Sequence, residues 1–386
     1  MSILDFKTKT NEIPRKNGAK EGHFVLALDI GYSAVKGFSD NKAFIFPSYA
    51  RKIDDRRVTL KEPDPTDIMY RDEDGTWIVG SLAYADVTSS DTVIDSESEL
   101  YGRHRFYSPM FKAILRTAYG IGLTANPYGN PAGKEIMVQT GLPVKYEKAD
   151  SGDLMDVLQG RHVFEIKLGR RPWQKFDITI PKKNISIMPQ PLGALISAST
   201  DKFGRPVADA KKYFSGKLIV FDPGFGTLDD YTVNHGTVVP WQCETFPEYG
   251  MREVFQRTVN DIYHTFGVSI EIPELQNHLT NGKIRVVSKK EMKSKEYSID
   301  NILKENCKQV FKEAIEKMKS AHNYFADVDY IIATGGTYEA WKEDFEKIFQ
   351  DMDGLTVIPA NVNDPSLSNV FSNVRGYYYY KASQIR

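Results

Sequence analysis

One stretch, Lys217 to Asp229, constrains the fold of this chain more than any other. An apolar run, Leu218 to Phe221, ends in Asp222, and Gly224 and Gly226 then bracket a turn before an alternating pattern resumes. The pattern predicts a strand, a glycine turn and a second strand. Glycines leave backbone N–H groups open to a phosphate oxygen, and a carboxylate at a strand end can hold Mg²⁺ through its water shell. Taken alone, the stretch is more typical of an ordinary β-hairpin.

The same pattern occurs a second time near the N-terminus. The apolar run Phe24 to Leu28 ends in Asp29, and Gly31 and Ser33 follow before the run that contains Lys36. The two aspartates lie about 190 residues apart. A repeated Asp-x-Gly hairpin indicates two related domains that face each other across a nucleotide and its metal ion.

Length and composition narrow the class of protein. A chain of 386 residues is long enough for about two domains. Its 50 basic and 51 acidic residues nearly cancel, so the net charge gives no reason to expect direct binding to nucleic acid or to a membrane. We find no signal-peptide pattern and no run that could span a bilayer, and we expect a cytoplasmic protein. Cys243 and Cys307 are the only cysteines, which predicts two free thiols.

The rest of the chain alternates expected strands and helices. Apolar residues at helical spacing predict helices over 108–122 and 299–325, and further helices after Gln190, after Gly250 and after the glycine pair at 335–336. The expected strands outside the two glycine hairpins are 43–47, 76–80, 134–143, 163–168, 176–180, 185–189, 238–246, 328–334 and 355–359. Residues 1–22 show no periodicity and are expected either to be disordered or to form a short arm, and 49–74 is expected to be an irregular surface excursion.

Three further segments offer candidate site residues. Gln190 stands just ahead of a predicted helix, where its amide either orients a water molecule or caps the helix. Gly335 and Gly336 separate a buried strand from a helix, so the backbone there can lie flat against a base or a phosphate. Arg252 and Glu253 either contact a ribose or base, or form an ordinary charged first turn.

The order of these motifs resembles a known superfamily. Asp29-x-Gly31, Gln190 before a helix, Asp222-x-Gly224-x-Gly226-Thr227 and Ala333-Thr334-Gly335-Gly336 are similar to the motifs of the actin, sugar-kinase and heat-shock chaperone ATPases. Within that superfamily the chain looks most like the prokaryotic actin-like proteins of the ParM type. The reasons are its size, the turn Gly141-Leu142-Pro143 and the closing pattern Asn373-x-x-Gly376-Tyr377. ParM proteins of plasmids often carry Glu where this chain has Gln190, which leaves the subfamily open.

The resemblance implies an α/β, actin-like (ribonuclease H-like) two-domain ATPase fold with the nucleotide in the interdomain cleft. Residues 1–22 would form the disordered arm and 23–190 the first domain, to which 361–386 would return; 191–360 would form the second domain.

The resemblance also implies ATP and Mg²⁺ as cofactors. Asp29 and Asp222 would hold the metal, chiefly through water, and Gln190 with Asp222 would be catalytic, Gln190 acting on the attacking water. Lys36 would reach a phosphate or lie on the outer face of its strand. The implied nucleotide contacts are Asp29, Gly31, Tyr32, Ser33, Lys36, Gly224, Phe225, Gly226, Thr227, Arg252, Glu253, Gly335, Gly336 and Thr337.

The function that the resemblance implies is an ATP-hydrolysing protein that forms dynamic filaments and drives plasmid DNA segregation. Its partners would be further copies of itself and a ParR-like adaptor that links the filament to centromere-like DNA, with no direct contact to nucleic acid and none to a membrane. Residues 49–74 and 266–298 are candidate filament contacts. The alternative is a small-molecule, sugar-type kinase, which needs a carboxylate base beside an acceptor hydroxyl. A chaperone would need a further peptide-binding domain. A choice between ATP and GTP does not follow from the residues.

Overall fold

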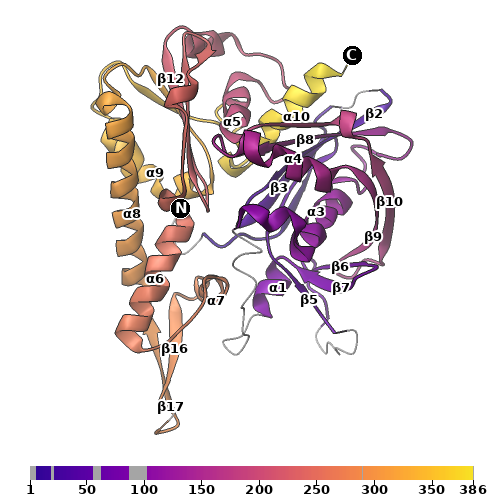
Figure 1. Ribbon diagram of the computed structural model, residues 1–386, viewed down its shortest axis with the longest axis vertical. Helices are drawn as coiled ribbons and strands as arrows, with labels where there is room; N and C mark the ends of the chain where they lie inside the picture. The colour runs from indigo at the N-terminus through magenta and orange to yellow at the C-terminus, as the bar shows by residue number, and fades with distance from the viewer. Residues whose placement is uncertain (1–5, 19–20, 55–61, 87–101, 289, 386) are drawn as a thin grey trace.

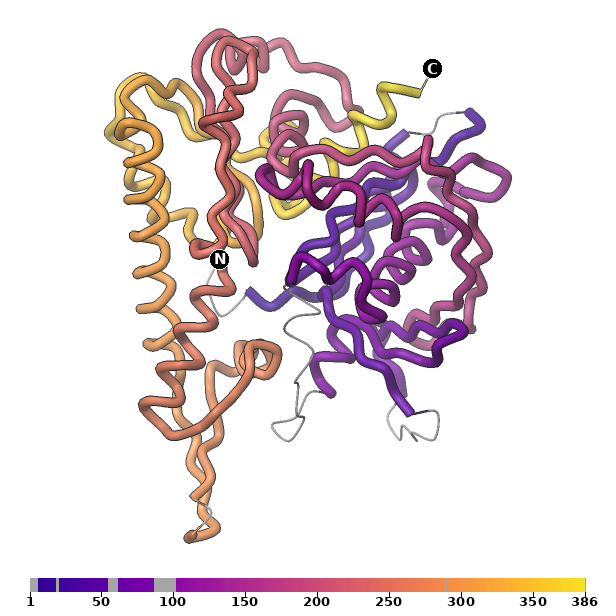
Figure 2. The backbone as a smooth tube through the Cα atoms, viewed as in Figure 1, coloured from indigo at the N-terminus to yellow at the C-terminus, as the bar shows by residue number. Residues whose placement is uncertain are grey.

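The computed structural model describes residues 6–18, 21–54, 62–86, 102–288 and 290–385. Within these residues the strands form four sheets, two of them large and each covered by helices. Figures 1 and 2 show the first large sheet, in indigo and magenta, on the right and the other large sheet, in red and orange, on the left. The two-part layout is the one expected from the repeated hairpin, and the α/β class is the one that the resemblance implied.

The first large sheet contains β2, the strand that ends in Asp29. Its order is β1 (Asn11–Pro14), β4 (Lys42–Pro47), β3 (Ala34–Ser39), β2 (His23–Ile30), β8 (Glu135–Leu142) and β11 (Ile185–Pro189). Strands β2, β8 and β11 are parallel, whereas β1, β4 and β3 join them by antiparallel pairing. Helices α3 (Pro109–Gly122) and α10 (Ser372–Gln384) both contact β2. This strand is apolar almost throughout because both of its faces are covered.

A smaller antiparallel sheet shares a core with the first. Its order is β10 (Gln174–Ile180), β9 (Gly160–Leu168), β6 (Ile68–Asp72), β7 (Gly75–Val79) and β5 (Ala50–Lys52). Helix α3, helix α4 (Glu147–Leu158) and the short α1 (Ser81–Ala85) contribute to the same apolar cluster. Helix α3 begins after Ser108, whose hydroxyl accepts a hydrogen bond from the Phe111 N–H at 3.0 Å, a normal N-cap.

The second large sheet contains β12, the strand that ends in Asp222 and Pro223. Its order is β14 (Thr237–Val238), β13 (Leu228–Asn234), β12 (Lys217–Pro223), β18 (Tyr330–Ala333) and β19 (Thr356–Pro359), with β15 (Glu244–Phe246) pairing β13. Alternation along β12 sends Ile219 and Phe221 to one face and Leu218 and Val220 to the other. The first pair packs with α6 (Met251–Phe266), α8 (Asp300–Ala321) and α9 (Gly336–Phe349), and the second pair packs with α5 (Gln190–Ser199).

A projecting unit separates α6 from α8 in the sequence. It consists of α7 (Ile272–His278) and the hairpin of β16 (Lys283–Ser288) and β17 (Lys293–Ser298), which Figure 2 shows extending away from the rest of the molecule at the bottom. The remaining elements are short 3-10 helices: η2 (Arg103–Tyr107), η3 (Lys182–Asn184), η4 (Ala208–Phe214), η5 (Pro240–Gln242), η6 (Pro247–Tyr249), η7 (Asn323–Phe325) and η8 (Asn369–Phe371).

Both glycine hairpins and all of the expected helices are confirmed, and three expectations about local structure need correction. The arm 1–22 is not disordered throughout, because β1 pairs with β4 and Glu12 forms an ion pair with Lys42 at 3.1 Å. The excursion 49–74 contains β5 and β6. The strand expected over 238–246 is interrupted by η5, because Pro240 has no N–H to donate to a neighbouring strand.

Two further features bear on the class of protein. Cys243 and Cys307 are buried and free, as expected. Among the described residues, no helix combines the length and the apolar character that crossing a bilayer requires. The domain boundaries at 23–190, 191–360 and 361–386 stay a prediction.

Candidate functional site

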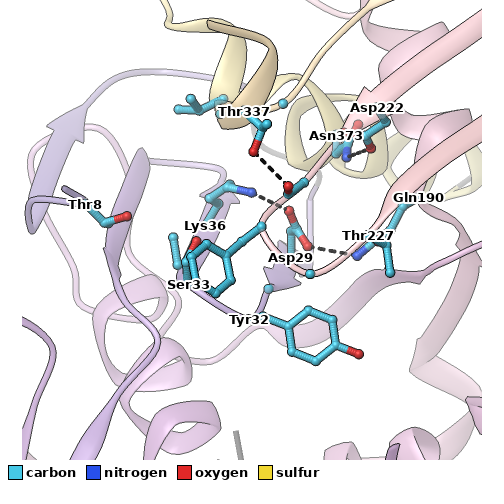
Figure 3. Close-up of a pocket in the computed structure, with 18 of the residues that line it drawn as sticks. Thr8, Asp29, Tyr32, Ser33, Lys36, Gln190, Asp222, Thr227, Thr337 and Asn373 are labelled. Atoms are coloured by element: carbon cyan, nitrogen blue, oxygen red, sulfur yellow. Dashed lines mark hydrogen bonds and ion pairs between the residues drawn. The ribbon is translucent and has the colours of Figure 1, made fainter. Parts of the chain in front are cut away.

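A cavity of about 230 Å³ lies between the two large sheets, at the ends of β2 and β12. Figure 3 shows the side chains that line it, which come from both hairpins, from α5, from the start of α9 and from α10. Strands β2 and β12 both end at this cavity, which is why each contributes the aspartate that closes its apolar run.

The first hairpin brings Asp29 and Lys36 together. They are directly opposite each other in the pairing of β2 with β3, and the Lys36 Nζ donates to Asp29 Oδ2 at 2.9 Å. The Gln190 Nε2 donates to the other carboxylate oxygen, Oδ1, at 3.2 Å. Burial by itself would lower the pKa of Lys36, but the charges of Asp29 and Asp222 outweigh it and raise that pKa. Lys36 therefore lines the cavity as a cation and does not lie on the outer face of its strand.

The second hairpin places Asp222 beside α10. The Gly224 N–H closes the turn by donating to the Thr227 carbonyl oxygen at 2.7 Å, and the Asn373 Nδ2 donates to Asp222 Oδ2 at 2.8 Å. Burial raises the pKa of Asp222 to about 6, against the opposing effects of Asn373 and Lys36. The Asn373 Oδ1 is buried and has no hydrogen-bond partner among the described residues, so it is an acceptor available to a ligand.

A third carboxylate, Asp229, stands beside this turn. The Thr227 hydroxyl donates to its Oδ2 at 3.1 Å, and the Thr245 hydroxyl donates to its Oδ1. Burial raises the pKa of Asp229 to about 7. We did not identify Asp229 as a site residue from the sequence. The available signal was an acidic residue placed inward at the start of an otherwise buried strand.

The two glycine loops pack against each other. A Cβ at Gly226 would lie 2.3 Å from the Tyr32 ring, so only glycine allows this approach. Arg105 also packs on the Tyr32 ring: its guanidinium carbon lies 4.3 Å from the ring centroid, and its Nη2 donates to the Ile30 carbonyl oxygen at 2.6 Å. Arg105 belongs to no sequence motif that we recognised. It reaches the site because η2 folds next to the end of β2, where Arg105 bonds Ile30.

The glycine pair closes the far side of the cavity. Gly335 has a φ of 92°, and a Cβ there would lie 2.6 Å from the Pro223 carbonyl oxygen. Helix α9 begins at Gly336, and the Thr337 hydroxyl donates to the Gly224 carbonyl oxygen at 2.7 Å. The N-terminus of α9 therefore forms part of the wall, and the orientation of its N–H groups favours a negatively charged ligand.

The structure brings nearly all of the predicted site residues to this one cavity. The predicted residues that line it are Asp29, Gly31, Tyr32, Ser33, Lys36, Gln190, Asp222, Gly224, Phe225, Gly226, Thr227, Gly335, Gly336 and Thr337. The lining residues that the sequence interpretation missed are Phe6, Lys7, Thr8, Lys9, Ala34, Ile45, Arg105, Pro143, Asp229, Val370 and Asn373.

Arg252 and Glu253 are not among the lining residues. Both lie in the first turn of α6, where the Arg252 N–H donates to the Phe225 carbonyl oxygen at 2.8 Å. The Glu253 carboxylate accepts from Arg257 Nε at 2.8 Å, and Arg257 also pairs with Glu313. Through Arg257, the Glu253 carboxylate of this first turn is linked to α8. This contact is the ordinary structural role that was the alternative to binding a ribose or base.

The donor set suits a magnesium ion. Asp29, Asp222 and Asp229 supply carboxylate oxygens around one cavity, and the unpartnered Asn373 Oδ1 is a further oxygen. Mg²⁺ prefers oxygen ligands and keeps several of its waters, so one or two of these carboxylates are enough.

Comparison with known proteins identifies the fold. Residues 27–193 match the family described as the actin-like proteins N-terminal domain. Among solved structures, a non-polymerisable quadruple mutant of pCBH ParM has a TM-score of 0.71 at 21% identity, over 94% of this chain and 99% of that one. A 15-stranded ParM filament from Clostridium botulinum has a TM-score of 0.68 at 19% identity, over 94% and 99%.

A third similar structure was solved with a nucleotide. The archaeal actin homolog Ta0583 in complex with ADP has a TM-score of 0.59 at 18% identity, over 93% of this chain and 99% of that one. No curated protein sequence matches the chain. At these identities the solved structures show the fold, which is the one that the resemblance of the motifs implied.

Proposed function

We propose that this chain, which has the actin-like fold of ParM, binds and hydrolyses ATP with Mg²⁺ and assembles into filaments that segregate plasmid DNA. The observation that supports the proposal best is the meeting of both Asp-x-Gly hairpins and the Gly335–Gly336 pair around one cavity between two sheets. In this combination, open N–H groups suit a polyphosphate, carboxylates suit its metal ion, and the flat glycine backbone suits a planar base.

In the proposed site, each group has a separate task. The turn residues Gly31 and Ser33 on one side and Gly224 to Thr227 on the other receive the phosphates, and Gly335 with Gly336 lies against the nucleoside. Asp29 and Asp222 hold the metal's waters, and the bound metal neutralises charge that develops on the transferred phosphoryl group. Lys36 pairs with Asp29 and offsets part of the negative charge of the two aspartates.

Gln190 is proposed to position the attacking water. Its Nε2 is used in the hydrogen bond to Asp29, which fixes the amide and leaves Oε1 as an acceptor for a water O–H. An amide is too weak a base to remove the proton, so its contribution is orientation. Among the described lining residues, the only carboxylate besides Asp29 and Asp222 is Asp229. Both of its oxygens already accept hydrogen bonds, from the Thr227 and Thr245 hydroxyls, so it is poorly placed to deprotonate a sugar hydroxyl, which favours hydrolysis over transfer to a small-molecule acceptor.

Filament formation is proposed from the fold and from the projecting unit. One of the structures with this fold is itself a 15-stranded ParM filament. In this chain the β16–β17 hairpin exposes Val287 and Met292, and its outer strand edges pair with no other described strand. These are features of a surface that contacts another protein. A ParR-like adaptor that links the filament to centromere-like DNA, and a cytoplasmic location, belong to the same proposal.

Light scattering with simultaneous phosphate release tests the proposal. ATP and Mg²⁺ are added to the purified protein, and we expect scattering to rise and then to decay as phosphate appears. Asp222→Asn is the matched variant, because it keeps the side-chain shape beside Asn373 and removes the charge; it should show neither signal. Steady phosphate release with no change in scattering over a wide range of protein concentration would contradict filament formation. The kinase alternative would then be tested with candidate acceptor substrates.

A further inference from the structure

The segment Phe6 to Lys9 lies outside every motif that identified the site, yet all four of its residues line the cavity. It precedes β1, which is attached to the edge of the first large sheet through β4. Figure 2 shows the indigo N-terminal chain reaching from that sheet toward the left-hand half of the molecule. The segment therefore crosses the mouth of the cavity from one large sheet to the other.

Phe6 anchors the segment on the far side. Its ring is stacked on Phe225 at a centroid distance of 6.4 Å and meets Phe255 edge-on at 5.9 Å. It also lies 3.8 Å from the position that a Cβ of Gly336 would take. Phe6 thus touches the second glycine loop and the glycine pair together, and these aromatic contacts fix where the next three residues lie.

Lys7 and Lys9 change the charge of the cavity. Among the described residues, its lining contains three carboxylates, Asp29, Asp222 and Asp229, and two cations besides these lysines, namely Lys36 and Arg105. Lys36 is paired with Asp29, and Arg105 donates to a backbone carbonyl. Without Lys7 and Lys9 the formal charge of the lining is negative, which opposes the entry of a polyphosphate; with them it is positive.

Neither lysine is neutralised within the described part of the chain. The Lys7 Nζ donates to the Thr280 hydroxyl at 3.4 Å, and no described carboxylate forms an ion pair with Lys7 or Lys9. Burial and the charge of Lys9 both lower the pKa of Lys7. Two cations held near each other at the mouth of a cavity are relieved by an anion, which is the ligand that the rest of the site suits.

We propose that residues 6–9 form a nucleotide-binding strap, in which Phe6 anchors the chain and Lys7 and Lys9 supply positive charge to the polyphosphate of the bound nucleotide. This inference rests on the proposed function of the cavity. It adds to the site a segment that belongs to neither glycine hairpin.

Calorimetric titration of the full chain with Mg·ATP and with AMP tests the strap. We expect the double variant Lys7→Ala/Lys9→Ala to raise the Kd for ATP about tenfold, equivalent to about 1.4 kcal/mol, and the Kd for AMP by less than about threefold. The pair Lys7→Arg/Lys9→Arg should restore the affinity for ATP. Lys16→Ala, an exposed lysine of the same N-terminal segment that does not line the cavity, is the control and should leave both Kd values unchanged.

The outcomes separate the strap from the site itself. If the wild-type chain binds ATP and the double alanine variant binds it equally well, the strap is wrong and the nucleotide site stands. Tighter binding of ATP by the variant would also overturn the proposal, because residues 6–9 would then obstruct nucleotide binding. A wild-type chain that binds no nucleotide contradicts the proposed function itself.

A third variant tests the role of Phe6. Phe6→Ala should raise the Kd for ATP by releasing the strap, and adding it to Lys7→Ala/Lys9→Ala should cause little further loss, because both changes remove the same contribution. Fully additive losses would overturn the anchoring role.

Discussion

The main chains of Gly193 and Gly376 are in direct contact where α5 crosses α10. A Cβ at Gly376 would lie 1.8 Å from the Gly193 carbonyl oxygen, and a Cβ at Gly193 would lie 2.6 Å from the Asn373 carbonyl oxygen. Helix α10 packs on the first large sheet and α5 on the second, so this crossing, in the upper middle of Figure 1, joins the two halves.

Replacing Gly376 tests how much the fold depends on that crossing. Gly376→Ala should lower the free energy of unfolding by about 2–4 kcal/mol, because two backbones must separate to admit the methyl group. Chemical denaturation measures the change. Gly152→Ala is the matched control: it lies in α4 with nothing within 4 Å of the added Cβ, and it should be neutral or stabilising. Equal stability of Gly376→Ala and wild type would mean that α5 and α10 are not held this close.

Gln190→Ala should separate hydrolysis from binding. Because the amide is proposed to orient water and only its Nε2 contacts the site, at Asp29, the variant should lose about 10²-fold in kcat for ATP hydrolysis while its Kd for ATP changes little. Filaments formed by the variant should disassemble more slowly than those of wild type. The control is Gln159→Ala, an amide bonded to Asp156 away from the cavity. An unchanged kcat would remove Gln190 from the mechanism.

The buried carboxyl of Asp40 should make the free energy of unfolding depend on pH, and this effect is independent of the nucleotide site. Burial raises the pKa of Asp40 from 3.8 to about 6, although the Tyr378 hydroxyl donates to its Oδ1 at 2.7 Å. Below about pH 4 the carboxyl is protonated in the folded and the unfolded state, whereas above about pH 6 folding buries a charge. This cost to wild type therefore develops between those pH values and stays constant above them.

Asp40→Asn should remove that cost. The variant should be more stable than wild type by roughly 1–3 kcal/mol at pH 8, and the difference should vanish near pH 4. Thermal unfolding across this pH range measures the difference. Asp353→Asn, at an exposed position, should show no such trend. A stability difference that is the same at every pH would contradict the assignment to this carboxyl.

The β16–β17 hairpin offers a test of the filament surface. Val287 is 52% exposed and Met292 is 85% exposed. If this surface contacts a neighbouring copy, Val287→Glu/Met292→Glu should raise the critical concentration for assembly about tenfold or more by burying charge at the contact, with no effect on the Kd for ATP. Sedimentation measures assembly. The apolar pair Val287→Ile/Met292→Leu should assemble normally, and normal assembly of the glutamate pair would place the contact elsewhere.

The glycine hairpins were predictable because their signals are local. An apolar run that ends in Asp222 and a turn with Gly224 and Gly226 define a strand, its end and its turn within a few residues of sequence. The repetition at Asp29 and Gly31 then gave the two-part fold. For Arg252 and Glu253, the sequence showed only that they lie in the first turn of a helix. The Glu253 carboxylate turned out to bond Arg257, which pairs with Glu313 of α8, and that contact depends on how α6 packs against α8.

The sequence by itself determined where strands end in aspartate and where the backbone requires glycine, since alternation and φ preferences are properties of neighbouring residues. Only the tertiary structure decided which distant residues complete the cavity. Asn373 reaches Asp222 from α10, Arg105 supports Tyr32 from η2, and Phe6 docks on Phe225 across the cleft. Each of these contacts joins segments far apart in the chain, and its geometry follows from how complete sheets and helices pack together, which no local pattern records.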